Sequence, residues 1–178
     1  MMNRGAVPFR RRKKAFPGKF PNIGKGRPLK VVVFGGSISV EASAIGKCAP
    51  WMPRWDDVMI ICFSMNDAGR PFSTEQFIAN TQSIMDSIRA QNSDAEFILL
   101  MSFQNNPKWR SLKPMIDYLE ALKALEGPGV AVVDMWTMHG YLLENKTYWD
   151  MTGNHVNHPN DFLVRIYAQT LLATLGVE

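Results

Sequence analysis

Four short runs of apolar residues, separated by longer mixed segments, set the pattern of this chain. They span residues 29–34, 58–63, 96–102 and 130–133, and valine, isoleucine and leucine are frequent in them. A continuous apolar run of this length, without alternation, is typical of a strand that is buried on both faces of a parallel sheet. The pattern therefore predicts four parallel strands.

Between these runs, apolar residues recur at helical spacing. One helix is expected over residues 73–88, which begin with the spacing of a capping box. A second is expected over residues 112–125, which a Gly-Pro pair follows as a stop signal. A third is expected to have Pro159 in its first turn. Its predicted inner face comprises Leu163, Ile166, Tyr167, Leu171 and Leu175, with Gly176 near its end.

Alternating strands and helices predict an α/β fold of three layers around a parallel sheet. In such folds, ligands bind beyond the carboxyl ends of the strands. A chain of 178 residues that is 46% hydrophobic can bury one good core. We therefore expect one domain, residues 29–178, behind a leader of residues 1–28.

The charge of the chain is unevenly placed. Residues 1–30 contain ten lysines and arginines and no acidic residue, whereas the rest of the chain contains ten basic and sixteen acidic residues. The densest basic run, residues 10–14, can attract phosphate groups or anionic lipid. A solvated, disordered leader is the favoured interpretation, and the scarcity of interleaved aromatic residues argues against nucleic acid as a partner.

The composition disfavours several classes of protein. No apolar run reaches the ~20 residues of a membrane span, and no signal peptide is visible, so the chain as written is expected in the cytoplasm, with its compartment otherwise open. Two cysteines do not make a disulfide framework. His155 and His158 form a His-x-x-His pair with no third ligand in sequence reach. We therefore expect no metal site.

Three polar side chains with catalytic chemistry follow predicted strands or precede a helix. Ser37 follows the first strand across two glycines, Asn66 follows the second, and His158 precedes the last helix. A serine nucleophile, an amide that donates to an oxyanion and an imidazole base are the parts of an acyl-transfer site. Each segment alone also has a structural explanation, such as an Asn-Asp-Ala-Gly turn that Asp67 would brace. His139, after the fourth run, is expected at the surface or in a loop.

The order of these segments resembles that of the SGNH (GDSL-type) hydrolase family. The resemblance covers residues 29–176, and it implies a flavodoxin-like sheet with Ser37 as nucleophile, His158 as base and Asn66 as oxyanion donor. It also implies hydrolysis of acyl esters without a cofactor, and short acyl groups, such as acetyl on carbohydrate, are the expected substrates. The motifs that carry it are Gly35-Gly36-Ser37-Ile38-Ser39, Ser64-Met65-Asn66-Asp67 and Asn157-His158-Pro159-Asn160.

Three residues in or beside these motifs depart from the family pattern. Gly36 stands where the family has an acid after the first glycine, and Ser64 stands where it has a glycine. His155 stands three residues before His158, where the family has an acid. A second imidazole does not stabilise an imidazolium as a carboxylate would. The alternatives for orienting His158 are a backbone carbonyl, Asp150 or Asp161.

The chain is also short between Ser39 and Asp57. Seventeen residues stand where the family has a second strand and a motif with an oxyanion glycine, and Gly46 is the one glycine in this gap. Gly46 is therefore the candidate for that third donor. In the family's sheet order 2-1-3-4-5, loss of the second strand leaves the first strand exposed. Such an edge invites pairing, so we expect a homodimer through it, or residues 40–56 lying across it.

Two hypotheses follow. The first is a serine esterase that hydrolyses short acyl esters, with Ser37, His158 and Asn66 as its machinery. The second is a catalytically degenerate hydrolase fold that acts as a binding protein, with its basic leader on nucleic acid or an acidic surface. The missing acid and the short gap favour the second, whereas the presence of all three polar residues favours the first.

Overall fold

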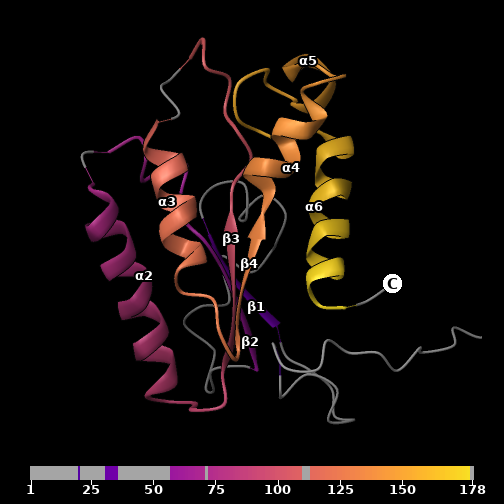
Figure 1. The fold of residues 1–178 in the computed structure, drawn as a ribbon. Helices are drawn as coiled ribbons and strands as arrows, with labels where there is room; N and C mark the ends of the chain where they lie inside the picture. The colour runs from indigo at the N-terminus through magenta and orange to yellow at the C-terminus, as the bar shows by residue number, and fades with distance from the viewer. Residues whose placement is uncertain (1–19, 21–30, 36–56, 71, 110–112, 177–178) are drawn as a thin grey trace, which may run out of the picture.

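A computed structural model of the protein describes residues 20, 31–35, 57–70, 72–109 and 113–176. Their elements alternate between strands and helices along most of the chain (Figure 1). The strands are β1 (Val31–Gly35), β2 (Val58–Cys62), β3 (Glu96–Met101) and β4 (Val130–Asp134). The helices are α2 (Thr74–Arg89), α3 (Lys113–Lys123), α4 (Met135–Leu142), α5 (Tyr148–Met151) and α6 (Asp161–Thr174).

The strands form one parallel sheet in the order β1-β2-β3-β4. Val31 pairs with Val58 at one end of the β1–β2 ladder, and Gly35 pairs with Cys62 at the other. All six residues of β3 are buried. This confirms the prediction from the apolar runs, because a central parallel strand is covered on both faces.

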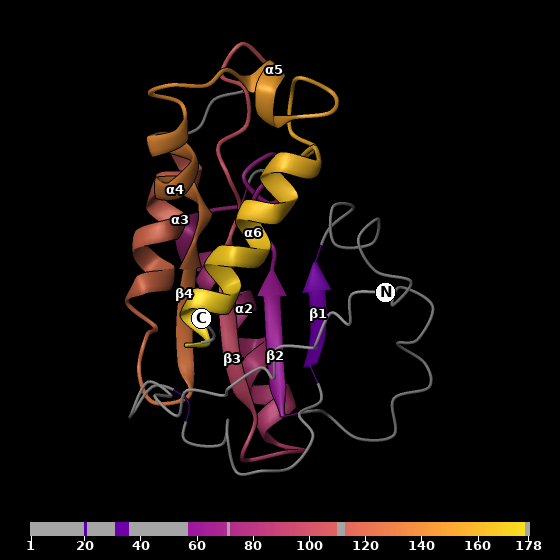
Figure 2. The ribbon, with the colours of Figure 1, turned by 90° about the vertical axis from the view of Figure 1, so that its right-hand side faces the viewer.

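Helices cover both faces of the sheet. α2 and α3 lie on one face, and α6 lies on the other, where it crosses in front of the strands (Figures 1 and 2). Phe77 of α2 stacks on Tyr118 of α3 with ring centroids 4.1 Å apart, and the Tyr118 hydroxyl donates to the carbonyl of Phe72. The predicted three-layer, flavodoxin-like α/β fold is confirmed.

The helix starts follow from their capping residues. The Ser73 side chain accepts from the backbone N–H of Gln76 at 3.2 Å, as the capping-box spacing predicted. The prediction that Pro159 lies in the first turn of the last helix is wrong. The Asn160 side chain caps α6 by accepting from the N–H groups of Phe162 and Leu163, so the helix begins at Asp161 and Pro159 precedes it.

The prediction that the first strand is an exposed edge, covered by another chain or by residues 40–56, rests partly on residues that the structure does not describe. Among the described residues, β1 has β2 as its one neighbour, and Val31 is 46% exposed. Residues 36–56 lie outside the described ranges, so the missing strand and the homodimer remain predictions. The leader 1–28 also lies outside them, apart from the buried side chain of Phe20. None of the helices in the described part of the chain has the length and hydrophobicity to span a bilayer.

Candidate active site

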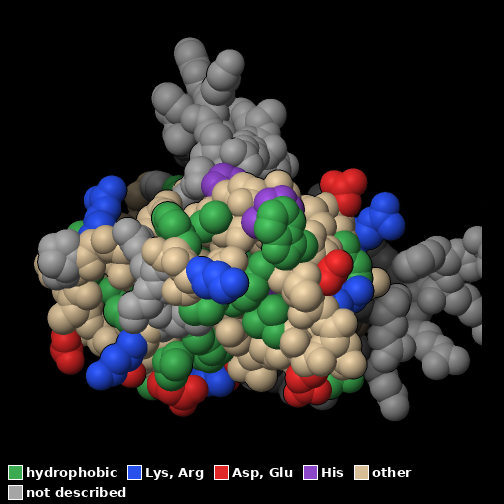
Figure 3. All heavy atoms as spheres, turned by 90° about the horizontal axis from the view of Figure 1, so that it is seen from above, with side chains coloured by type: hydrophobic (Ala, Val, Ile, Leu, Met, Phe, Trp, Pro, Cys, Tyr) green, Lys and Arg blue, Asp and Glu red, His purple; other side chains and the backbone are tan. Residues whose placement is uncertain are grey.

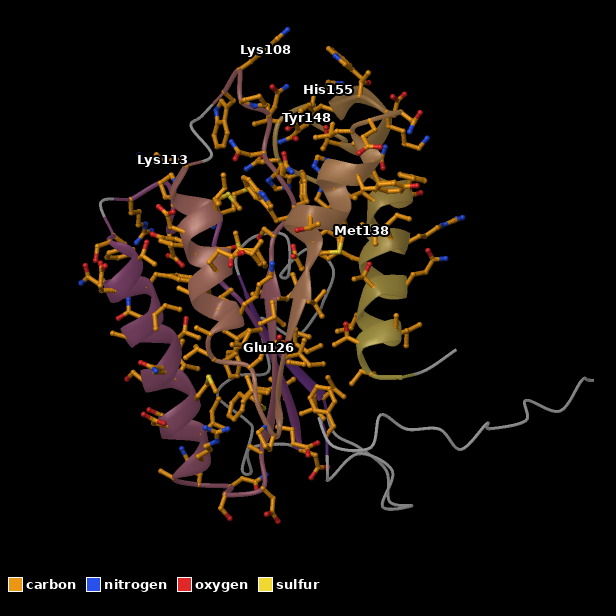
Figure 4. All side chains as sticks on the ribbon, in the orientation of Figure 1. Lys108, Lys113, Glu126, Met138, Tyr148 and His155 are labelled. Atoms are coloured by element: carbon orange, nitrogen blue, oxygen red, sulfur yellow. The ribbon has the colours of Figure 1, made fainter. Side chains whose placement is uncertain are left out.

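The carboxyl ends of the strands point to one end of the molecule, uppermost in Figure 1. Three described segments lie beyond that edge: residues 63–70 after β2, residues 102–109 after β3, and residues 143–160 around α5. Lys108, Tyr148 and His155 are all found there (Figure 4). Seen from above, histidine side chains reach the surface beside hydrophobic ones (Figure 3).

Two of the predicted site residues, Ser37 and Gly46, lie outside the described residues. β1 ends at Gly35, two residues before Ser37, and its end is level with the end of β2. The other four, Asn66, Asp67, His155 and His158, are described.

Asn66 lies on a tight turn directly after β2. The turn is closed by the N–H of Ala68, which donates to the carbonyl of Ser64 at 2.8 Å, and by the N–H of Gly69, which donates to that of Asn66 at 3.2 Å. The Asn66 side chain is exposed, and within the described part of the chain its amide has no hydrogen-bond partner. The amide is therefore available to donate to a ligand.

Asp67 is a half-buried residue of the same turn. Burial raises the pKa of its carboxyl, and the positive charge of Arg70 partly offsets this. Burial also raises the pKa of Tyr118 in α3, and the charge of Asp67 adds to that effect. The bracing role of Asp67 in the turn stays a prediction.

Ser64 has a structural function that the sequence did not reveal. Its buried hydroxyl donates to the hydroxyl of Ser102 at 2.8 Å and accepts from the backbone N–H of Ser102 at 3.3 Å. These bonds join the ends of β2 and β3 below the Asn66 turn. In the position where the family has a conformationally free glycine, this chain thus has a serine whose side chain links two strands.

His158 lies on a closed loop, residues 152–160, between α5 and α6. Thr152 and Pro159 form an antiparallel bridge at its base. Inside the loop, the N–H of Gly153 donates to the carbonyl of His158 at 2.9 Å, and the N–H of His158 donates to Oδ1 of Asn154 at 2.9 Å. Both backbone polar groups of His158 are therefore held.

The same loop is tied to the segment that follows β3. The N–H of Asn106 donates to the carbonyl of Val156 at 2.9 Å, and its side-chain amide donates to the carbonyl of His155 at 3.0 Å. The Tyr148 hydroxyl donates to the carbonyl of Asn105 at 3.1 Å. These bonds place the His158 loop at the carboxyl edge of the sheet, the same edge as the Asn66 turn.

His155 does not take the place of an acid behind His158. Its ring packs on that of Trp149, with centroids 3.4 Å apart, and its buried Nδ1 has no partner within the described residues. The carboxylate of Asp150 accepts from the N–H and the hydroxyl of Thr147, and these bonds lower its pKa. Asp161 lies exposed in the first turn of α6.

The prediction for His139 is wrong. It is fully buried in α4, where it contacts the rings of Phe103 and Tyr148, with centroids 5.1 and 5.4 Å away. Neither ring nitrogen has a hydrogen-bond partner within the described residues, and burial lowers the pKa of His139 to about 4. A histidine in this environment is neutral and belongs to the core.

Two observations bear on other kinds of site. Among the described residues, no group of three or more His, Cys, Asp or Glu side chains is arranged to hold a metal ion. A cavity of about 450 Å³ lies at the opposite end of the sheet, between α2 and the turn before β4. It has Asp86 and Arg89 in its wall but none of the predicted catalytic residues, so the candidate site remains at the carboxyl edge.

A three-layer fold with an asparagine turn and an anchored histidine loop at one edge of its sheet fits an acyl hydrolase. Residues 11–162 match the family model described as the GDSL-like lipase/acylhydrolase family. Because the match spans most of the chain, the protein belongs to this family, and membership indicates ester hydrolase activity. Comparisons with curated proteins and with solved structures find no match.

Proposed function

We propose that the protein is a serine esterase that hydrolyses short acyl esters through an acyl-enzyme, with acetyl groups on carbohydrate as a candidate substrate. Ser37 is the nucleophile, His158 the general base and Asn66 an oxyanion donor. The backbone amide of Ser37 is a second donor, and Gly46 is the candidate for a third.

The reaction has two balanced steps. The hydroxyl oxygen of Ser37 attacks the ester carbonyl while His158 takes the hydroxyl proton, and the oxyanion that forms accepts hydrogen bonds from Asn66. The intermediate then releases the alcohol, which receives that proton from His158. Water attacks the acyl-enzyme in the same way, and the acid and the free Ser37 hydroxyl are produced.

The anchoring of the His158 loop carries this proposal. The loop is bonded to the segment after β3, so His158 and Asn66 belong to one edge of the sheet. The Asn66 amide is exposed and has no partner within the described residues, as a donor kept for a ligand requires. Membership of the GDSL-like lipase/acylhydrolase family supports acyl hydrolysis as the reaction.

The test is a covalent label together with a rate assay. A fluorophosphonate reacts with an activated serine, and we expect one adduct per chain, located by mass spectrometry at Ser37. With a small activated ester such as p-nitrophenyl acetate, Ser37→Ala should abolish turnover. Asn66→Ala should lower kcat by about 10²- to 10³-fold, the usual loss for one oxyanion donor.

Matched controls come from the same chain. Ser39→Ala removes the hydroxyl of a serine two residues further along the chain, and Asn145→Ala removes an exposed amide that has no bond within the described residues. Both should keep the rate of the intact chain. A Ser37→Ala variant that keeps the full rate overturns the mechanism and favours the binding-protein hypothesis instead.

A further inference from the structure

Asn154 makes an unusual number of contacts for one side chain. Its Oδ1 accepts from three consecutive backbone N–H groups, those of Val156, Asn157 and His158, at 3.0, 2.9 and 2.9 Å. Its Nδ2 donates to the side-chain oxygen of Asn157 at 2.9 Å. All four bonds lie within the His158 loop, so this side chain determines how the loop is folded.

We propose that Asn154 is a positioning residue for the base His158, an inference that rests on the proposed esterase function. The His158 backbone is held on one side by Oδ1 of Asn154 and on the other by the N–H of Gly153. Pro159 follows and forms the bridge with Thr152. These contacts fix the backbone from which the imidazole of His158 projects.

The neighbouring residues explain why such a support is needed. In the relatives, an acid three residues before the histidine orients the ring, and here that position holds His155, whose ring lies on Trp149. His155 also has a left-handed backbone, with a φ of 59°, which is costly for a residue other than glycine. The bonds from the Asn154 side chain to residues 156–158 span this residue and hold the chain in that conformation.

The role of Asn154 is positional, and it predicts an effect on kcat rather than on KM. Misplacement of a catalytic group by about 1 Å can cost ~10²-fold in rate. We expect Asn154→Ala to lower kcat by about 10- to 100-fold and to leave KM unchanged, because Asn154 makes no contact with substrate in the proposed mechanism. Asn145→Ala is the matched control and should retain both constants.

Asn154→Asp is the conservative variant that should rescue the rate. Its carboxylate oxygen accepts the same three N–H groups, and the Asn157 amide can turn to donate to the second oxygen. Asn154→Gln keeps the amide but moves its oxygen by one methylene, so it should lose kcat as the alanine variant does. If Asn154→Ala does not fold, the inference is tested by comparing kcat of Asn154→Asp with kcat of Asn154→Gln.

A spectroscopic measurement separates this inference from the proposed function. The imidazole resonances of His158, assigned by their loss in His158→Gln, should be sharp and single in the intact chain and in Asn154→Asp. In Asn154→Ala or Asn154→Gln they should broaden or split as the ring samples several orientations.

The His158 resonances test the positioning role of Asn154 even if the intact chain hydrolyses no ester. In that case the proposed esterase function is refuted, and the positioning role is judged from the resonances. Unchanged His158 resonances and kcat in the alanine variant, or an aspartate variant as impaired as the glutamine variant, would overturn the inference.

Discussion

Replacement of the buried His139 should remove a defined part of the acid sensitivity of the fold. In the folded chain, burial lowers the pKa of His139 to about 4, whereas an unfolded histidine titrates near ~6.5. As the pH falls between these values, His139 becomes protonated in the unfolded chain but stays neutral in the folded chain. Stability is therefore complete above pH ~6.5 and is lost on acidification toward pH ~4.

The size of the loss follows from the shift. Each pH unit of this window costs up to about 1.4 kcal/mol, so His139 accounts for at most about 3.5 kcal/mol across it. His139→Phe keeps an aromatic ring beside Phe103 and Tyr148 and removes the proton-binding site. At pH ~7 the variant should be within about 1 kcal/mol of the intact chain, because no hydrogen bond of the ring is lost.

Urea unfolding at neutral pH and at two acidic values measures the effect. The intact chain should lose more free energy of unfolding on acidification than His139→Phe, by up to about 3.5 kcal/mol. Met135→Leu changes another fully buried side chain of α4 but no titratable group, so it should keep the full loss. Parallel loss of stability in the intact chain and His139→Phe would refute the argument that buried, unpartnered His139 resists protonation.

Two further predictions concern the fold. Ser64→Ala should lower the free energy of unfolding by about 1–3 kcal/mol, since it leaves the buried hydroxyl and N–H of Ser102 without their partner. As a control, replacing the exposed Ser87 by alanine should change it by no more than ~0.5 kcal/mol. If both variants lose the same free energy of unfolding, Ser64 does not link the strands as described. Gly129 has a φ of +74°, so Gly129→Ala should cost about 1–2 kcal/mol in urea unfolding. Gly127→Ala, which has open space, is the control and should cost less.

Much of the fold was predictable because its signals are local. The strands were found from their uninterrupted apolar runs, and the prediction of β2 agrees with the structure to within one residue at its end. α4 was missed, since apolar residues occupy most positions of Met135–Leu142 and leave no helical periodicity. α5 has four residues, too few for any period. His139 was misplaced for the same reason, because α4 was not recognised as a buried helix.

The site was predictable as chemistry but not as geometry. The motif order indicated Asn66 and His158, and the structure holds both at the carboxyl edge. The support of His158 depends on contacts between distant segments, such as those of Asn106 with the loop, and no single-sequence pattern reports these. A useful signal was present in Asn154, four residues before His158, because asparagine side chains commonly accept from the backbone just ahead of them.

Two of the departures from the family pattern, at Ser64 and at His155, have different consequences for the site. Ser64 exchanges the freedom of a glycine for a bond to Ser102, so it stabilises the edge on which Asn66 turns. His155 packs on Trp149, and the task of orienting the base passes to hydrogen bonds of the loop backbone. A neutral amide such as that of Asn154 fixes direction but adds no negative charge beside an imidazolium. In this chain, therefore, the positioning of His158 and the stabilisation of its charge are separable, and the uncharged variants Asn154→Ala and Asn154→Gln act on positioning alone.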